Sequence, residues 1–175
     1  MSVDTVYGLD QTDANGTHAH LAGIMGEFLD VNYASTAEIK PILSQHKIYA
    51  RWVKNDSGGT LAANKAVVYK DGYHLKRVGA ACGVSPARPD GVVNPYAGTI
   101  ADGSWFWMIV RGPCKLITDG SGALAIGDNI TTAASGKTKI VASGTAATIP
   151  GQFAKCGETV AATADLTYRA IVTCE

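Results

Sequence analysis

The sequence predicts an all-β protein: a sandwich or small barrel of about eight to ten short strands, with an extended N-terminal arm and at most one short helix. Many short apolar runs are separated by glycine, aspartate, asparagine and serine, which is typical of strands joined by turns. Residues that favour helices are present but rarely recur at helical spacing. A single open sheet of so many strands would curl or split, so a sandwich or closed barrel is favoured.

Residues 1–47 differ from the rest of the chain and are expected to form an arm, with the β domain spanning residues 48–175. Residues 10–20 are polar and rich in turn formers, and residues 21–29 are apolar but too glycine-rich for a good helix. An arm that cannot bury its own apolar side chains buries them on something else. We therefore expect capsid or subunit contacts from these arm residues: Tyr7, Leu9, His18, His20, Leu21, Ile24 and Phe28.

The helix candidate lies at residues 35–46. Ser35 and Glu38 fit a capping box, in which each side chain satisfies a free backbone N–H group of the other residue. Pro41 limits the helix to a turn or two, because its ring clashes with the preceding turn.

The first half of the β domain contains three expected strands and a long loop. The strands are expected at residues 48–53, 66–69 and 73–82, with turns at 55–59 and 71–72. The stretch from Ser85 to Gly98 contains three prolines and is expected to be a surface loop, which is a natural place for a partner contact.

The second half begins with a dense aromatic and β-branched run, residues 104–110, which stops at Gly112-Pro113. Further strands are expected at residues 114–118, 129–132, 139–141, 153–156 and 166–174. The last run alternates between two faces and predicts a C-terminus held in a sheet. The sequence shows no repeat of fixed period.

Composition and charge exclude several classes of function. The 15 basic and 15 acidic residues give a formal net charge of zero, whereas a nucleic-acid-binding protein usually carries a basic excess. The N-terminus does not resemble a signal peptide, and no run of apolar residues is long enough to span a membrane. We therefore expect folding in a cytoplasm. The four widely spaced cysteines are expected to be buried, reduced thiols.

The sequence contains no pattern typical of catalysis, so we expect no enzyme, no cofactor and no metal site. His18 and His20 would share one face of an extended segment and could hold a metal, but no third ligand lies nearby in the sequence. The turn at residues 119–122, followed by Asp128, lacks the spacing of a calcium loop. No serine or cysteine has the local pattern of a nucleophile, and no glycine motif for phosphate precedes a helix.

Trp105 and Trp107 would point to one face of their strand, and Phe106 and Met108 to the other, so both faces need apolar cover. Three explanations remain open at this point. The strand is central in the core, or one face lies in a subunit interface, or the tryptophans form a platform for a sugar.

Several segments resemble a known family. They are Arg51–Leu61 followed by Lys65–Val68, then Trp105–Gly112 leading to Gly127–Ile130, and finally Phe153–Gly157 before the closing strand. This order resembles the small β-rich capsid decoration (cement) proteins of tailed bacteriophages, over about residues 49–175. Asn64 stands where that pattern more often has glycine.

The resemblance implies a homotrimer on the outer surface of the phage head, where it binds the major capsid protein and stabilises contacts between neighbouring capsomers. It also implies that the N-terminal arm contacts the capsid, and that the protein is part of the virion. Two other functions remain open. One is a virion or cell-surface glycan-binding adhesin that uses Trp105, Trp107 and the loop at residues 85–98. The other is an enzyme that uses paired acids or His18 and His20.

Overall fold

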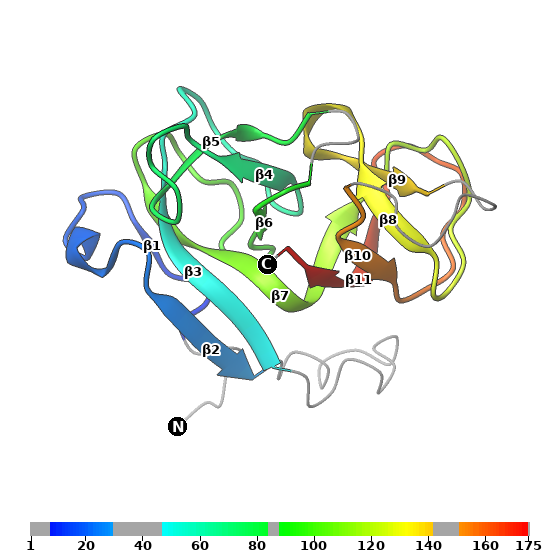
Figure 1. Cartoon of the computed structure of the whole chain (residues 1–175), viewed down its shortest axis with the longest axis horizontal. Helices are drawn as coiled ribbons and strands as arrows, with labels where there is room; N and C mark the ends of the chain where they lie inside the picture. Colours follow the sequence, from blue (N-terminus) through cyan, green and yellow to red (C-terminus); the bar gives the residue numbers. More distant parts are fainter. Residues whose placement is uncertain (1–7, 30–46, 84–87, 142–150, 175) are drawn as a thin grey trace.

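The computed structural model describes residues 8–29, 47–83, 88–141 and 151–174 (Figure 1). Over these residues the chain is all-β, with eleven strands in one continuous sheet, so the predicted fold class is confirmed. Two short 3-10 turns accompany the strands, η1 at Ala19–Leu21 and η3 at Ala134–Gly136. The helix predicted at residues 35–46 lies outside the described residues. In the described ranges, no helix has the length and hydropathy needed to span a membrane.

Most strands lie where the sequence predicts them. Their bounds are β1 (Thr12–Asp13), β2 (Met25–Leu29), β3 (Lys47–Asn55), β4 (Ala66–Tyr69), β5 (Arg77–Ala81), β6 (Gly91–Val93), β7 (Trp105–Ile117), β8 (Asn129–Thr132), β9 (Thr138–Ile140), β10 (Ala154–Cys156) and β11 (Thr167–Thr173). β4 and β8 coincide with their predicted ranges. β5 is shorter than predicted, because residues 73–76 form a turn in which the backbone of Leu75 has a positive φ of 66°.

Two predictions about strands and loops are wrong. The expected surface loop at residues 85–98 contains β6, whose residues are buried between β4 and β7. The expected break at Gly112-Pro113 lies inside β7, which runs through it. Gly112 adopts a φ of 106°, and a Cβ there would lie 2.3 Å from the carbonyl oxygen of Lys47, so only glycine fits.

The sheet closes into two small barrels that share β7. In the first barrel the ring of paired strands is β3–β5–β4–β6–β7–β3. In the second it is β7–β11–β10–β8–β9, and it returns to the end of β7 through a parallel bridge between Thr118 and Thr138. Figure 1 shows the first barrel in cyan and green and the second in yellow to red, with β7 passing from one to the other.

The two barrels have the same topology. In each, the first strand is parallel to the third and antiparallel to the fifth, and the other pairs are antiparallel. Backbone hydrogen bonds are repeated too: the bond from Asn55 N to Ser104 O, 2.8 Å long, corresponds to the bond from Thr118 N to Leu166 O, 2.9 Å long. The chain is therefore an internal duplication of a five-stranded barrel, and the sequence-based expectation of no repeat is wrong.

The interiors of the barrels correspond residue by residue. The first barrel has a separate core cluster of nine buried residues. Each has a buried counterpart in the second barrel, at an offset of 60 to 63 residues. The pairs are Val53 with Leu116, Leu61 with Leu124, Val67 with Ile130, Val78 with Thr138, Val93 with Cys156, Ile100 with Val160, Phe106 with Tyr168, Met108 with Ala170 and Val110 with Val172.

The part of the predicted arm that the structure describes, residues 8–29, is joined to the first barrel. β1 pairs with the start of β7, and all five residues of β2 pair with β3. The side chain of Leu9 is fully buried in the core, and its carbonyl accepts a hydrogen bond from Asn94 Nδ2. Leu9 and the strands β1 and β2 therefore pack on their own chain, which differs from the expected extended arm, whereas Ile24 and Met25 keep exposed side chains. Residues 1–7 and 30–46 lie outside the described residues.

Candidate interaction surface

A loop built on Asp13 holds the two predicted histidines in place. Asp13 Oδ1 accepts hydrogen bonds from the backbone N–H groups of Asn15 and Gly16, at 3.0 and 2.9 Å, and Oδ2 accepts one from His18 N at 2.7 Å. These donors, His18 first, lower the pKa of the Asp13 carboxyl. The loop therefore has a defined shape and leaves the side chains of His18 and His20 exposed.

Aromatic rings form a row across the outer face of β3 and β7, next to residues 8–29. The ring centroids of Trp52 and Trp107 are 5.2 Å apart, and Phe28 meets Trp107 edge-on at 5.1 Å. His18 meets Trp52 edge-on at 6.5 Å, and Trp52 Nε1 donates a hydrogen bond to His18 O at 3.1 Å. Such contacts stabilise beyond the area that they bury, so they fasten residues 8–29 to the barrel.

Trp105 and Trp107 share this face, as the alternation predicts, while Phe106 points into the first barrel. Trp105 is only 8% exposed, with Gly16 beside its ring nitrogen. Trp107 is half-buried, and a Cβ on Gly26 would lie 3.0 Å from its ring. The cover of this face comes from the same chain, so Leu9 and Trp105 are core residues rather than surface residues. A sugar stacked on Trp105 would have to displace residues 8–29.

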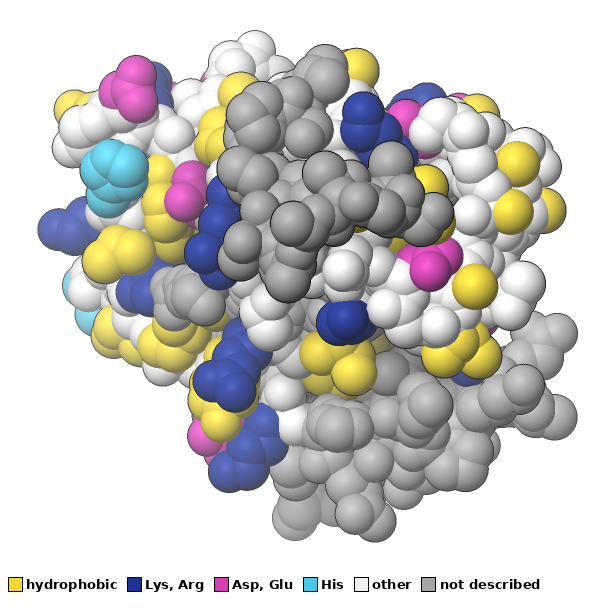
Figure 2. All heavy atoms as spheres, turned by 45° about the vertical axis from the view of Figure 1, so that its right-hand side comes forward, with side chains coloured by type: hydrophobic (Ala, Val, Ile, Leu, Met, Phe, Trp, Pro, Cys, Tyr) yellow, Lys and Arg dark blue, Asp and Glu magenta, His cyan; other side chains and the backbone are white. Residues whose placement is uncertain are grey.

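Exposed apolar side chains gather at the end of the first barrel. Ile24 is 47% exposed, Met25 37%, Tyr73 44% and Leu75 44%. The two segments that carry them touch, because a Cβ on Gly23 would lie 3.3 Å from Leu75 O. We name these four residues the apolar pole. Figure 2 shows hydrophobic side chains, in yellow, between histidines, in cyan, along the left edge of the molecule.

The left-handed backbone of Leu75 adds a second feature to the apolar pole. A branched residue at positive φ costs free energy, and a residue held in that way is more common at functional sites than elsewhere. Its large side chain faces solvent, so burial within the described residues does not offset that cost. Contact with a partner would bury it.

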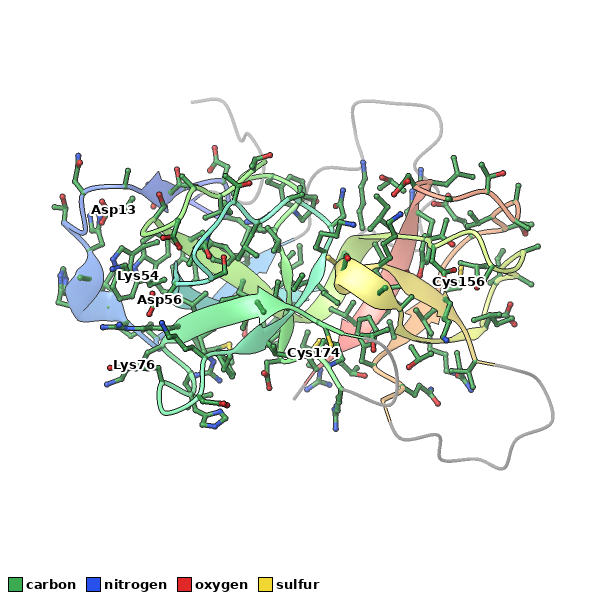
Figure 3. The ribbon with its side chains drawn as sticks, turned by 90° about the horizontal axis from the view of Figure 1, so that it is seen from above. Asp13, Lys54, Asp56, Lys76, Cys156 and Cys174 are labelled. Carbon is green, nitrogen blue, oxygen red and sulfur yellow. The ribbon has the colours of Figure 1, made fainter. Side chains whose placement is uncertain are left out.

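Charged residues surround the pole. Asp56 Oδ2 lies 3.0 Å from Lys70 Nζ and 3.1 Å from Arg77 Nη1, and hydrogen bonds from these side chains, Lys70 first, lower the pKa of the carboxyl. The guanidinium of Arg77 also stacks over the ring of Tyr73, 4.2 Å from its centroid. Figure 3 shows Asp13, Lys54, Asp56 and Lys76 together at this end of the molecule. An apolar centre with a charged rim is the usual anatomy of a protein–protein interface.

The side chains that could bind a metal ion do not cluster in the described part of the chain. Within it, no group of three histidine, cysteine, aspartate or glutamate side chains could hold a metal ion. The rings of His18 and His20 are 6.3 Å apart. All four cysteines are buried, as predicted, and none forms a disulfide. Burial raises the pKa of the Cys82 and Cys156 thiols and favours their neutral form.

No protein-family model matches the chain, and no curated protein matches it. Solved structures do match it. One is the head fiber gp8.5 N base of bacteriophage phi29, with a TM-score of 0.50 and 12% sequence identity over 72% of this chain and 94% of that chain. At this identity the likeness shows a shared fold.

The sequence identified part of this surface. Of the residues expected to make capsid or subunit contacts, Ile24, His18 and His20 are exposed, Leu21 and Phe28 are half-buried, and Tyr7 lies outside the described residues. Sequence reasoning missed Met25, Tyr73 and Leu75. Tyr73 and Leu75 read as alternating positions of a strand, although Asp71-Gly72 before them marks a turn, and a longer turn places both side chains at the surface.

Proposed function

We propose that this chain is a structural protein of a tailed-phage head, which binds the outer surface of the capsid and stabilises contacts between capsomers. The observation that carries the proposal is the fold shared with the phi29 head fiber base, which extends over 94% of that chain. The order of motifs that resembles the capsid decoration proteins supports it. In this role the protein acts by binding, is part of the virion and works as a homotrimer.

The apolar pole is the proposed contact with the major capsid protein. Burial of its side chains contributes roughly 25 cal/mol for each Å² of apolar surface removed from water. A single small contact of this kind is weak. Multiple contacts per oligomer strengthen attachment, because the second and third binding events become intramolecular.

Binding to heads of the phage that encodes this chain tests the proposal. The variant Ile24→Asp/Leu75→Asp changes two exposed residues of the apolar pole, and we expect it to need at least about tenfold more protein for the same occupancy. Ile126→Asp is the matched control, because Ile126 is 63% exposed but lies on the second barrel. Occupancy is measured by sedimentation of heads with the bound protein.

Deletion of residues 1–30 would be a poor test, because it removes β1 and β2 from the sheet. Wild-type protein that does not bind heads would contradict the proposed function. Equal binding by wild type and Ile24→Asp/Leu75→Asp would instead contradict only the assigned surface. Light scattering on the free protein tests the homotrimer separately.

A further inference from the structure

The outer face of the second barrel carries a cluster of basic residues. On β7, β11 and β10, the residues that point away from the core include Arg111, Lys115, Arg169 and Lys155. Strand register brings them together: Lys115 lies directly across from Arg169, and Lys155 across from Ile171. Arg88 reaches the end of the same face, where its Nη2 donates a hydrogen bond to Thr173 O at 3.0 Å. We name these five basic residues and Ile171 the basic face.

Among the described residues, one acidic side chain is recorded in contact with this cluster. Glu158 approaches it: one carboxylate oxygen accepts a hydrogen bond from Arg169 N at 2.6 Å, and the other lies 4.0 Å from Arg169 Nε. Within the described part of the chain, these five positive side chains therefore have one recorded carboxylate contact, in a chain whose formal net charge is zero. Like charges directly across a strand pair destabilise a sheet, so the Lys115–Arg169 pair has a cost in the isolated protein.

Because of the duplication, the outer face of the second barrel can be compared with the equivalent face of the first barrel. The positions of Lys115 and Arg169 correspond to those of Trp52 and Trp107, which also lie directly across from each other. The tryptophan pair packs against residues 8–29 of the same chain. No described residue forms strands over the corresponding face of the second barrel. One of the two equivalent faces thus packs within the chain, and the other carries an exposed lysine, Lys115, beside the largely buried Arg169.

We propose that the basic face is a second docking surface, which binds an acidic surface of a partner protein. Charge complementarity fixes the sign of the partner's surface. Ile171, which is 37% exposed between Lys155 and Arg169, gives the face an apolar centre with a polar rim, as protein interfaces have. A protein partner is favoured over nucleic acid because the chain as a whole has no basic excess. This proposal rests on the charges of this chain and holds whether or not it binds phage heads.

The test uses the full chain and a fluorescent poly-L-glutamate peptide as the acidic probe, with binding followed by anisotropy at low salt. We expect Lys115→Glu/Lys155→Glu to weaken binding at least about tenfold, and added salt to weaken wild-type binding. Both lysines are exposed, so the fold should persist, and circular dichroism checks this. The milder Lys115→Gln/Lys155→Gln variant should weaken binding in the same direction if the charge reversal does not fold.

Lys54→Glu/Lys76→Glu is the matched control, with the same change in net charge at the far end of the molecule (Figure 3). We expect this variant to bind the probe within about twofold of wild type, because salt screens the effect of charges that lie far from the binding surface. Equal weakening by both double variants would show non-specific attraction and overturn the proposal. So would a wild-type chain that does not bind the probe, or one that binds a DNA duplex of equal charge more tightly than the peptide.

Discussion

The two barrels of this chain are built on one plan and differ in their outer faces. Both have the same strand order, and both close through a parallel contact between their first and third strands. The first barrel covers its Trp52–Trp107 pair with residues 8–29. The second presents Lys115 and Arg169 at the same positions. In this molecule the backbone plan and the buried positions are shared, while the outer positions carry different side chains.

One difference lies inside the barrels. The first barrel has Val78 and Phe106 where the second has Thr138 and Tyr168. The hydroxyl groups of Thr138 and Tyr168 lie 2.7 Å apart, and Thr138 Oγ1 also donates to Ile117 O at 2.8 Å. The same space is therefore filled by an apolar pair in one barrel and by a hydrogen-bonded pair in the other. This makes the chain its own control for three experiments.

The largest effect is expected from the equivalent core leucines. Leu61→Ala and Leu124→Ala each leave a cavity at a site that is at most 4% exposed, so each should lower the free energy of unfolding by about 2–5 kcal/mol. Because β7 belongs to both barrels, we expect one unfolding transition in each variant. Urea unfolding followed by circular dichroism and by tryptophan fluorescence checks this, since all three tryptophans lie on β3 and β7 in the first barrel.

The two signals would separate if the barrels were independent. In that case Leu124→Ala would lose circular dichroism at a lower urea concentration than fluorescence. That result would contradict the expected single transition and would show that the shared strand β7 does not couple the unfolding of the two barrels.

A smaller effect is expected from the hydroxyl pair. Thr138→Val leaves the buried hydroxyl of Tyr168 without that partner and should cost about 1–3 kcal/mol, while Tyr168→Phe should cost about 1 kcal/mol. The double variant recreates the Val–Phe pair of the first barrel. We therefore expect it to be more stable than Thr138→Val alone, measured by urea unfolding of all four proteins. Additive losses would show that the pair is not coupled.

The smallest effect is expected from Asp56 and its counterpart Asp119. The folded state lowers the pKa of Asp56 through Lys70 and Arg77, so this stabilisation is present above the usual range of a carboxyl pKa and is lost as pH falls through the folded value. Asp56→Asn should lower the free energy of unfolding at pH 7 by less than about 1 kcal/mol, measured by thermal unfolding, and the loss should shrink as the pH falls through the folded pKa of Asp56. Asp119→Asn is the control, because Asp119 accepts hydrogen bonds from Ser121 instead. A loss for Asp56→Asn that grew as pH fell would contradict the assigned ion pairs.

The sequence was sufficient for most strands of the β domain but not for β1, β2 and β6, and it was insufficient for the arrangement of the strands. Runs such as residues 66–69 and 129–132 are rich in β-branched residues and are followed by turns, so local chemistry identifies them. β6 was missed because a strand of three residues between prolines carries too little pattern. Strand pairing between distant segments is not encoded locally, so neither the division into two barrels nor the packing of residues 8–29 could be derived.

The duplication did leave a trace in the sequence. Residues 56–62 and 119–125 share an aspartate, a glycine, a leucine and an alanine at the same spacing, 63 residues apart. Asn64 and Gly127 follow at corresponding positions with φ of 66° and 89°, which asparagine and glycine tolerate best. The candidate surface was partly predictable, because apolar residues such as Ile24 signal contact. Whether their cover is internal, as for Trp105, depends on the three-dimensional packing.

The shared strand also determines how the molecule would carry mechanical load. A pull between the end of the first barrel and the outer face of the second passes along β7, which is hydrogen-bonded to β3 over its first half and to β11 over its second. Tension along a pair of antiparallel strands loads many backbone hydrogen bonds in shear at once, instead of opening these hydrogen bonds one after another. We therefore expect β7 to transmit tension between the two barrels along one continuous strand.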